Sequence, residues 1–149
     1  MIVKSLEHLN SLSQKVADKL DKNDCIFLIG EIGVGKTTFT RYLINHLQEK
    51  NGEIITEVLS PTFNLLYEYD LKTIKIMHYD LYRIKDEKEL KHLGIFLDKK
   101  DTIKIIEWPQ LINIPSSDKL EMYIDYAENE NEREVKFKGS ERWKILNEL

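Results

Sequence analysis

The chain has little cysteine, little proline and no long apolar run. Its one cysteine, Cys25, cannot form a disulfide within the chain, so we expect a reducing, cytoplasmic setting. Because Cys25 lies in the apolar run 25–29, we predict a core residue rather than a reactive thiol. No stretch approaches the ~20 apolar residues of a membrane-spanning helix. The first ten residues lack the apolar segment of a secretory signal, and we expect no membrane association.

The chain also has fewer basic than acidic residues. The 149 residues include 22 Lys and Arg against 26 Asp and Glu, which gives a formal net charge of −4. This balance disfavours broad non-specific binding of nucleic acid, which requires a basic face, although it leaves room for a local basic patch. The length fits one domain, which we place at residues 1–149.

Hydrophobic periodicity predicts an α/β fold with a central, partly parallel sheet flanked by helices. Helical spacing is found over residues 5–20, 37–50, about 86–94 and from 140 to the end, with Ser5 and Ser140 as expected N-caps. Strand patterns are found over residues 25–29, 54–59 (weak), 63–69, 73–79, 103–106, 119–126 and 132–138. The last two form a predicted C-terminal antiparallel hairpin, and residues 108–118 a predicted loop.

A glycine-rich segment lies between the first predicted strand and the second long helix. It reads Gly30-Glu31-Ile32-Gly33-Val34-Gly35-Lys36-Thr37-Thr38 and satisfies G-x-x-x-x-G-K-[ST]. Glycines allow the backbone N–H groups to turn inward on phosphate oxygens, and the following helix directs its positive end at the same anion. Lys36 can reach the β- and γ-phosphates and the Thr37 hydroxyl can ligate Mg²⁺. We predict that this P-loop binds ATP with Mg²⁺; the alternative is an ordinary glycine-rich turn.

Hydrolysis also requires acidic groups near the metal and a group that orients water. Glu107 follows the apolar run 103–106, at the strand edge where open α/β sheets bind ligands, and Asp80 follows the strand predicted over 73–79. The rigid turn 60–63, which carries the hydroxyls of Ser60 and Thr62, is a candidate sensor of the γ-phosphate. The plain alternatives are a surface glutamate, a turn aspartate and a common proline turn.

Three further residue types have two interpretations each. Arg83 can stabilise transition-state charge or form a surface salt bridge. Trp108 can shield the nucleotide or belong to the core or an interface. The four histidines, at positions 8, 46, 78 and 92, show no metal-ligand spacing, and we expect them to be structural or solvated.

Taken in order, these segments resemble the TsaE (YjeE) family of bacterial P-loop ATPases over nearly the whole chain. The resemblance includes GEIGVGKTT at 30–38, SPTF at 60–63, HYDLYR at 78–83, Glu89-Leu90 with Leu93-Gly94, and IEW at 106–108. It implies an accessory ATPase that binds the TsaB–TsaD heterodimer and supports formation of threonylcarbamoyladenosine at tRNA position 37. Activity without the partners would be weak, and direct contact with tRNA stays open.

The resemblance also implies roles for particular residues. Lys36 and Thr37 match the positions that contact phosphate and Mg²⁺, Thr62 matches a switch-like loop, and Trp108 matches a tryptophan beside the acid. Asp80 and Glu107 match the acidic metal-side and catalytic positions, without a division of roles between them. The candidate catalytic residues are therefore Lys36, Thr62, Asp80 and Glu107, and the candidate metal ligands are Thr37, Asp80 and Glu107.

Three positions depart from the family pattern. Glu31 stands where aspartate is usual, and Val34 where alanine is usual. Neither side chain is needed for a backbone cradle, so we expect phosphate binding to survive. Gln110 stands where glutamate is frequent, which weakens any expectation of catalytic charge at position 110.

Three other functions fit a P-loop. A small-molecule kinase usually carries an arginine-bearing lid, whereas the four arginines here are not clustered. A GTPase switch usually carries Asn-Lys-x-Asp to read guanine, and the sequence lacks it. A regulatory module that binds nucleotide and barely hydrolyses it overlaps with the main prediction.

Overall fold

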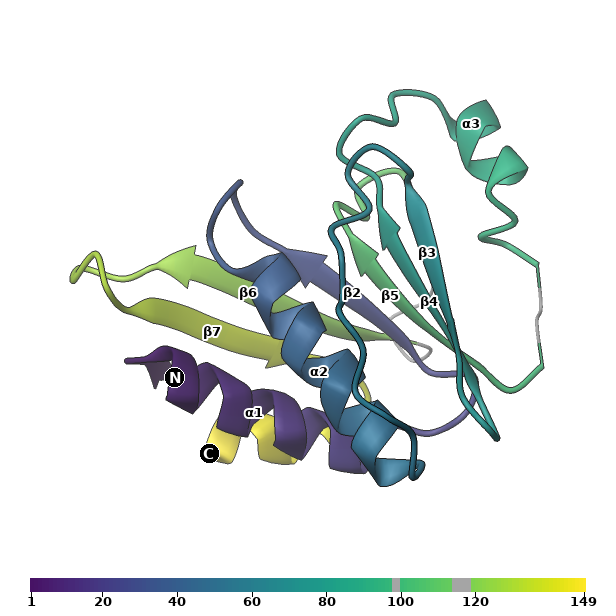
Figure 1. The fold of residues 1–149 in the computed structure, drawn as a ribbon. Coiled ribbons are helices and arrows are strands. Elements are labelled where there is room, and N and C mark those ends of the chain that lie inside the picture. Colours follow the sequence, from purple (N-terminus) through teal and green to yellow (C-terminus); the bar gives the residue numbers. More distant parts are fainter. Residues whose placement is uncertain (98–99, 114–118) are drawn as a thin grey trace.

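The computed structural model describes residues 1–97, 100–113 and 119–149, and within them it has seven strands and four helical segments (Figure 1). The strands are β1 (Ile2–Val3), β2 (Cys25–Ile29), β3 (Leu66–Asp70), β4 (Lys75–Asp80), β5 (Thr102–Glu107), β6 (Leu120–Tyr126) and β7 (Arg133–Lys138). The helices are α1 (Leu6–Lys19), α2 (Lys36–Lys50), α3 (Glu87–His92) and the 3₁₀ helix η2 (Glu141–Glu148). Residues 114–118 of the predicted loop lie outside the described residues.

All seven strands form one sheet in the order β1-β7-β6-β2-β5-β4-β3. The four central strands run parallel, because β2 pairs in parallel with both β5 and β6, and β4 pairs in parallel with β5. The flanking pairs β3–β4, β6–β7 and β1–β7 are antiparallel. The predicted α/β fold with a partly parallel sheet and a C-terminal hairpin is therefore confirmed.

Helices cover both faces of the sheet, which explains the continuous apolar run of β2. Its alternate residues Ile26 and Leu28 belong to a core cluster with residues of α1, α2 and η2, whereas Phe27 lies in a second cluster that includes Leu90 of α3. A strand buried on both faces needs apolar residues at successive positions rather than in alternation. No helix in the described part of the chain is long and apolar enough to cross a membrane.

The N-termini of α1 and α2 are capped differently. The Ser5 side chain accepts a hydrogen bond from the His8 backbone N–H at 3.1 Å, as expected of an N-cap. The helix α2 begins directly after the glycine-rich segment, with Gly35 at its N-cap and no side chain capping it. Its free N-terminal N–H groups therefore remain available to a ligand.

The strand predicted over residues 54–59 is wrong. This segment runs back along α2 instead, because the Gln48 side-chain amide donates to Thr56 Oγ1 at 2.8 Å and accepts from the Thr56 N–H at 3.2 Å. Arg41 of α2 also reaches the Val58 carbonyl, at 3.4 Å. These side-chain bonds replace the backbone pairing that a strand would make.

Three other elements differ from the sequence prediction. Strand β3 begins at Leu66 rather than 63, because Leu65 adopts a left-handed conformation with φ of 67° and closes a turn onto Pro61. The C-terminal helix is of the 3₁₀ type, and Ser140 makes no side-chain capping bond. The two-residue strand β1, missed from the sequence, pairs with β7.

Candidate nucleotide-binding site

The candidate site lies at the edge of the sheet where β2, β4 and β5 end. Glu107 at the end of β5 is the register partner of both Leu28 in β2 and Asp80 in β4. The P-loop leaves the same edge of β2, so the topology brings three distant segments together. They line a cavity of ≈ 280 Å³ formed by Ile32, Gly33, Gly35, Lys36, Thr37, Thr38, Thr62, Asp80, Tyr82, Glu107 and Trp108.

The P-loop glycines are required for two different reasons. Gly33 and Gly35 have φ values of 77° and 125°, which strain any residue with a side chain. Gly30 is required by space, since a Cβ there would lie 2.3 Å from the Ile124 carbonyl oxygen of β6. The conformation of the loop is therefore specified at both its start and its turn.

Lys36 is nearly buried beneath the P-loop. Its Nζ donates to the carbonyl oxygens of Gly30 and Glu31, each at 2.7 Å, and lies 4.4 Å from the centroid of the Trp108 ring. Burial lowers the pKa of the Lys36 ammonium, and the negative charges of Glu107 and Asp80 raise it in part. The lysine is thus held between the backbone of the loop and the acidic wall of the cavity.

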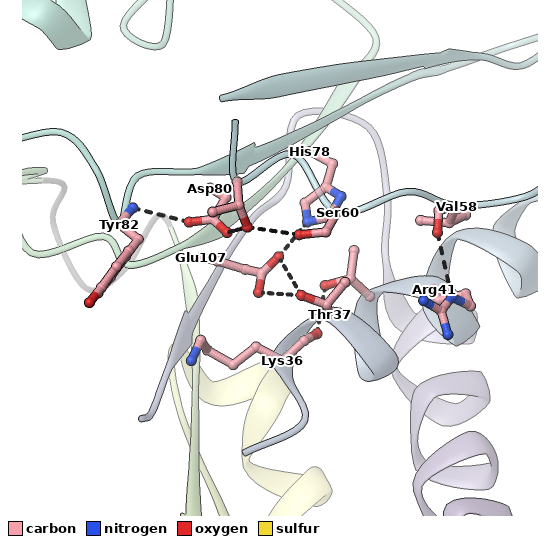
Figure 2. A network of polar contacts seen from close by, with 11 residues as sticks. Lys36, Thr37, Arg41, Val58, Ser60, His78, Asp80, Tyr82 and Glu107 are labelled. Carbon is pink, nitrogen blue, oxygen red and sulfur yellow. Dashed lines mark hydrogen bonds and ion pairs between the residues drawn. The ribbon is translucent and has the colours of Figure 1, made fainter. Parts of the chain in front are cut away.

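Glu107 joins the P-loop helix to strand β4 (Figure 2). Its Oε1 accepts a hydrogen bond from the Thr37 hydroxyl at 3.0 Å, and its Oε2 lies 2.7 Å from His78 Nε2. Glu107 is 2% exposed and His78 is fully buried. A carboxylate held by both oxygens in a buried setting has a fixed orientation, with its charge close to the start of α2.

Asp80 lies beside Glu107 and contacts the 60–63 turn (Figure 2). Its Oδ2 accepts from the Thr62 hydroxyl at 2.9 Å, and its Oδ1 accepts from the Tyr82 backbone N–H at 3.0 Å. The Ser60 hydroxyl lies 2.9 Å from Thr62 Oγ1. The Ser60–Thr62 turn is therefore linked to the acidic wall by a chain of hydroxyl contacts.

The chemistry of these groups suits Mg²⁺. The cavity presents the hydroxyl oxygen of Thr37 and the carboxylate oxygens of Asp80 and Glu107, which are the hard donors this ion takes. In the described residues no group of three or more His, Cys, Asp or Glu could hold a metal by itself.

Trp108 closes the cavity next to Glu107. Its backbone φ is 57°, a conformation that non-glycine residues rarely adopt, and its ring contacts Tyr82 with 4.9 Å between centroids. Such strain persists only where the surroundings hold it, and it concentrates at functional sites. The tight turn places the indole ring next to the Lys36 ammonium, and the partly buried side chain also packs against the second core cluster.

The structure places most of the predicted site residues around this cavity. Gly30, Glu31 and Val34 are in the loop but do not line the cavity, and Gly30 and Glu31 contribute their carbonyls. Outside the site lies Gln110, which lines a different cavity. Arg83 is also absent from the cavity lining, and its guanidinium lies 5.4 Å from the Phe63 ring.

Sequence reasoning missed His78 and Tyr82. It treated His78 as structural or solvated; the structure shows a buried, structural imidazole and adds that its partner is Glu107. The signal was present, because residues two apart on a strand share a face and His78 precedes Asp80 by two. Its Nδ1 has no hydrogen-bond partner in the described structure.

A second cavity of ≈ 200 Å³ adjoins the P-loop on the side of β7. It shares Gly33, Gly35 and Thr38 with the first cavity. The rest of its lining comes from the N-terminal segment, the P-loop and the β6–β7 hairpin: Val3, Ser5, Leu6, Leu9, Val34, Asn131 and Arg133. A ligand that lies along the P-loop can therefore reach both cavities.

Known proteins are similar to this chain in sequence and in fold. The sequence model of the family described as "Threonylcarbamoyl adenosine biosynthesis protein TsaE" matches residues 3–135. A relative from Rickettsia felis named "tRNA threonylcarbamoyladenosine biosynthesis protein TsaE" is 38% identical over 112 residues, covering 75% of this chain and 63% of the relative. The match thus spans less than two thirds of that relative's length.

Two Bacillus subtilis proteins extend the comparison. A relative with the same TsaE name is 31% identical over 134 residues, covering 88% of this chain and 79% of its own. The crystal structure of B. subtilis YdiB matches with a TM-score of 0.70 and 26% identity, over 99% of this chain and 90% of that one. With a P-loop facing two buried carboxylates and a family match over residues 3–135, the chain belongs to the TsaE family.

Proposed function

We propose that this protein is a Mg²⁺-dependent ATPase. The observation that carries the proposal is the contact of Thr37, the last P-loop residue, with the buried Glu107 at the end of β5. A hydroxyl at that position of a P-loop holds Mg²⁺, and an acid at the neighbouring strand end holds the metal or its water. When bound, Mg²⁺ would neutralise charge on the phosphates as the γ-phosphoryl group leaves.

The residues of the cavity would have different roles in nucleotide binding and hydrolysis. The P-loop amides and Lys36 bind the phosphates, and Asp80 and Thr37 lie on the metal side. Glu107, fixed by His78, orients or deprotonates the attacking water. Thr62 senses the γ-phosphate through Asp80. Its hydroxyl donates to the Asp80 carboxylate, and loss of the γ-phosphate from the metal site would change that contact.

The second cavity would take the nucleoside. It adjoins the P-loop on the side opposite Asp80 and Glu107, and its lining combines the apolar Val3, Leu6 and Leu9 with the polar Asn131. An apolar lining with few polar groups suits an aromatic base with a ribose. The phosphates would then extend from this cavity across the P-loop towards Lys36.

In the cell, the protein would support threonylcarbamoyladenosine modification of tRNA position 37 in the cytoplasm, acting with the TsaB–TsaD complex. The family match supports this role. The net charge of −4 is consistent with a protein that acts through protein partners rather than by gripping tRNA broadly. We therefore assign the chemistry of group transfer to the partners and the ATPase step to this chain.

The test is a turnover assay in which TsaB–TsaD is present or absent. We expect weak ATP hydrolysis by the isolated chain, stimulation by the partner pair, and dependence of multiple-turnover tRNA modification on ATP hydrolysis. GTP added as a competitor, and a screen for phosphoryl transfer to nucleosides, separate the ATPase from a GTPase and a kinase. Phosphoryl transfer to a small molecule at a rate above hydrolysis would contradict the proposal.

A further inference from the structure

A loop that turns its N–H groups towards an anion must turn carbonyl groups outward, and those carbonyls need partners of their own. In this P-loop, the carbonyls of Gly30 and Glu31 accept from Lys36 Nζ. The Gly35 carbonyl accepts from the Phe39 N–H of α2 at 2.9 Å. Two carbonyls in the middle of the loop, those of Ile32 and Val34, are bound from elsewhere in the chain.

Two side chains of the β6–β7 hairpin bind those middle carbonyls. Arg133 Nε donates to the Val34 carbonyl at 2.8 Å, and the Tyr126 hydroxyl donates to the Ile32 carbonyl at 3.4 Å. The guanidinium of Arg133 also lies 4.5 Å from the centroid of the Tyr126 ring. The two side chains therefore contact each other and the loop together.

The guanidinium is itself fixed by the hairpin. Its Nη1 donates to the carbonyls of Glu130 and Glu132, both at 2.8 Å. These two bonds and the ring of Tyr126 fix the guanidinium, whose Nε–H points at the Val34 carbonyl. Only a planar group with several donors makes all of these contacts, so a lysine ammonium cannot replace it.

We infer that Arg133, supported by Tyr126, is a positioning residue that holds the P-loop ready to bind a polyphosphate. The inference rests on the proposed function, because it concerns affinity for the nucleotide's phosphates. It differs from the role of Lys36, whose ammonium would bind phosphate directly. Arg133 contacts a carbonyl oxygen, which cannot donate to a phosphate, so its effect on affinity would act through the backbone of the loop.

The test compares affinity for Mg-ATP and for inorganic tripolyphosphate with Mg²⁺ in Arg133→Gln and Arg133→Lys. Loss of a hydrogen bond from a charged donor leads us to expect a ~10–100-fold rise in Kd for both ligands. The Lys variant should lose as much affinity as the Gln variant, because lysine keeps the positive charge but lacks the planar set of N–H donors of the guanidinium. Lys136→Gln is the matched control, because it removes one positive charge from the same strand. The Lys136 side chain is 63% exposed and is paired with Glu134.

Different outcomes have different meanings. If Arg133→Gln lost affinity for ATP but not for tripolyphosphate, the inference would be overturned in favour of a contact with the nucleoside, since Arg133 also lines the second cavity. Full affinity in Arg133→Lys would overturn it in favour of simple charge. An equal loss of affinity in Lys136→Gln would also overturn the inference, because it would show that any positive charge on β7 has this effect.

A measurement without ligand keeps this inference separate from the proposed function. Hydrogen exchange of the Gly33, Val34 and Gly35 amides in the free protein should be faster in Arg133→Gln than in the wild type, while amides in the middle of β2 stay unchanged. Unchanged exchange in the P-loop would overturn the inference. If the wild-type protein bound neither ATP nor tripolyphosphate, the proposed function would fail, and the exchange result would still decide whether Arg133 orders the loop.

Discussion

Asp80 and Glu107 are register partners at the ends of the adjacent parallel strands β4 and β5, and their carboxylates have different partners. Glu107 contacts Thr37 of the P-loop helix, and Asp80 contacts Thr62 of the 60–63 turn. The two acids therefore connect the cavity to two different segments of the chain. This division allows their roles to be separated by substitution.

Glu107→Gln should bind Mg-ATP and hydrolyse it at least ~100-fold more slowly. Glutamine keeps the shape of the side chain but cannot accept a proton, and general bases contribute at least this much. Calorimetry gives the Kd of the variant, and a phosphate-release assay gives kcat. A variant that fails to bind Mg-ATP would show that Glu107 chiefly holds the metal.

Asp80→Asn should weaken binding of Mg-ATP while leaving binding of ATP without metal nearly unchanged. The substitution removes a charged ligand for Mg²⁺ and keeps one acceptor oxygen for the Tyr82 N–H, while the amide NH₂ of asparagine donates to Thr62 Oγ1 in place of the bond that Asp80 accepts. Titrations in Mg²⁺ and in EDTA provide the two affinities. Equal weakening in both conditions would contradict a role at the metal.

Much of this site could be predicted from local sequence, because the P-loop is one continuous segment whose glycines and lysine have fixed spacing. The positions of Asp80 and Glu107 also followed locally, from strand ends that must meet at one edge of a parallel sheet. The contact between Glu107 and His78 did not follow, because it joins residues 29 apart in the sequence and depends on the pairing of β4 with β5. The segment 54–59 failed for a similar reason, since bonds from Gln48 and Arg41 determine its path.

His78→Leu should lower kcat more than it raises the Kd for ATP. Leucine fills the buried space but leaves Glu107 Oε2 without its partner at 2.7 Å, so the carboxylate loses its fixed orientation. We also expect a cost of about 1–3 kcal/mol in the free energy of unfolding, which urea titration measures. Met77→Leu, an equally buried change on the opposite face of β4, should leave kcat unchanged.

Cys25 should resist thiol reagents in the folded protein. Burial raises the pKa of its thiol to about 12, so almost no thiolate is present at pH 8. Between the ordinary thiol pKa of about 8.5 and this value, the unfolded chain releases a proton that the folded chain keeps, so rising pH favours unfolding. Reaction with Ellman's reagent should be slow in buffer and fast in denaturant; rapid reaction of the native protein would contradict the assignment of Cys25 to the core.

The most direct test of the central claim, that residues 30–37 bind the phosphates of ATP, is titration calorimetry with Mg-ATP and Mg-ADP. We expect the wild-type protein to bind both nucleotides and Lys36→Ala to lose that binding, while circular dichroism shows that the variant is folded. Absence of binding by the wild type, or unchanged affinity and hydrolysis in Lys36→Ala, would contradict the account.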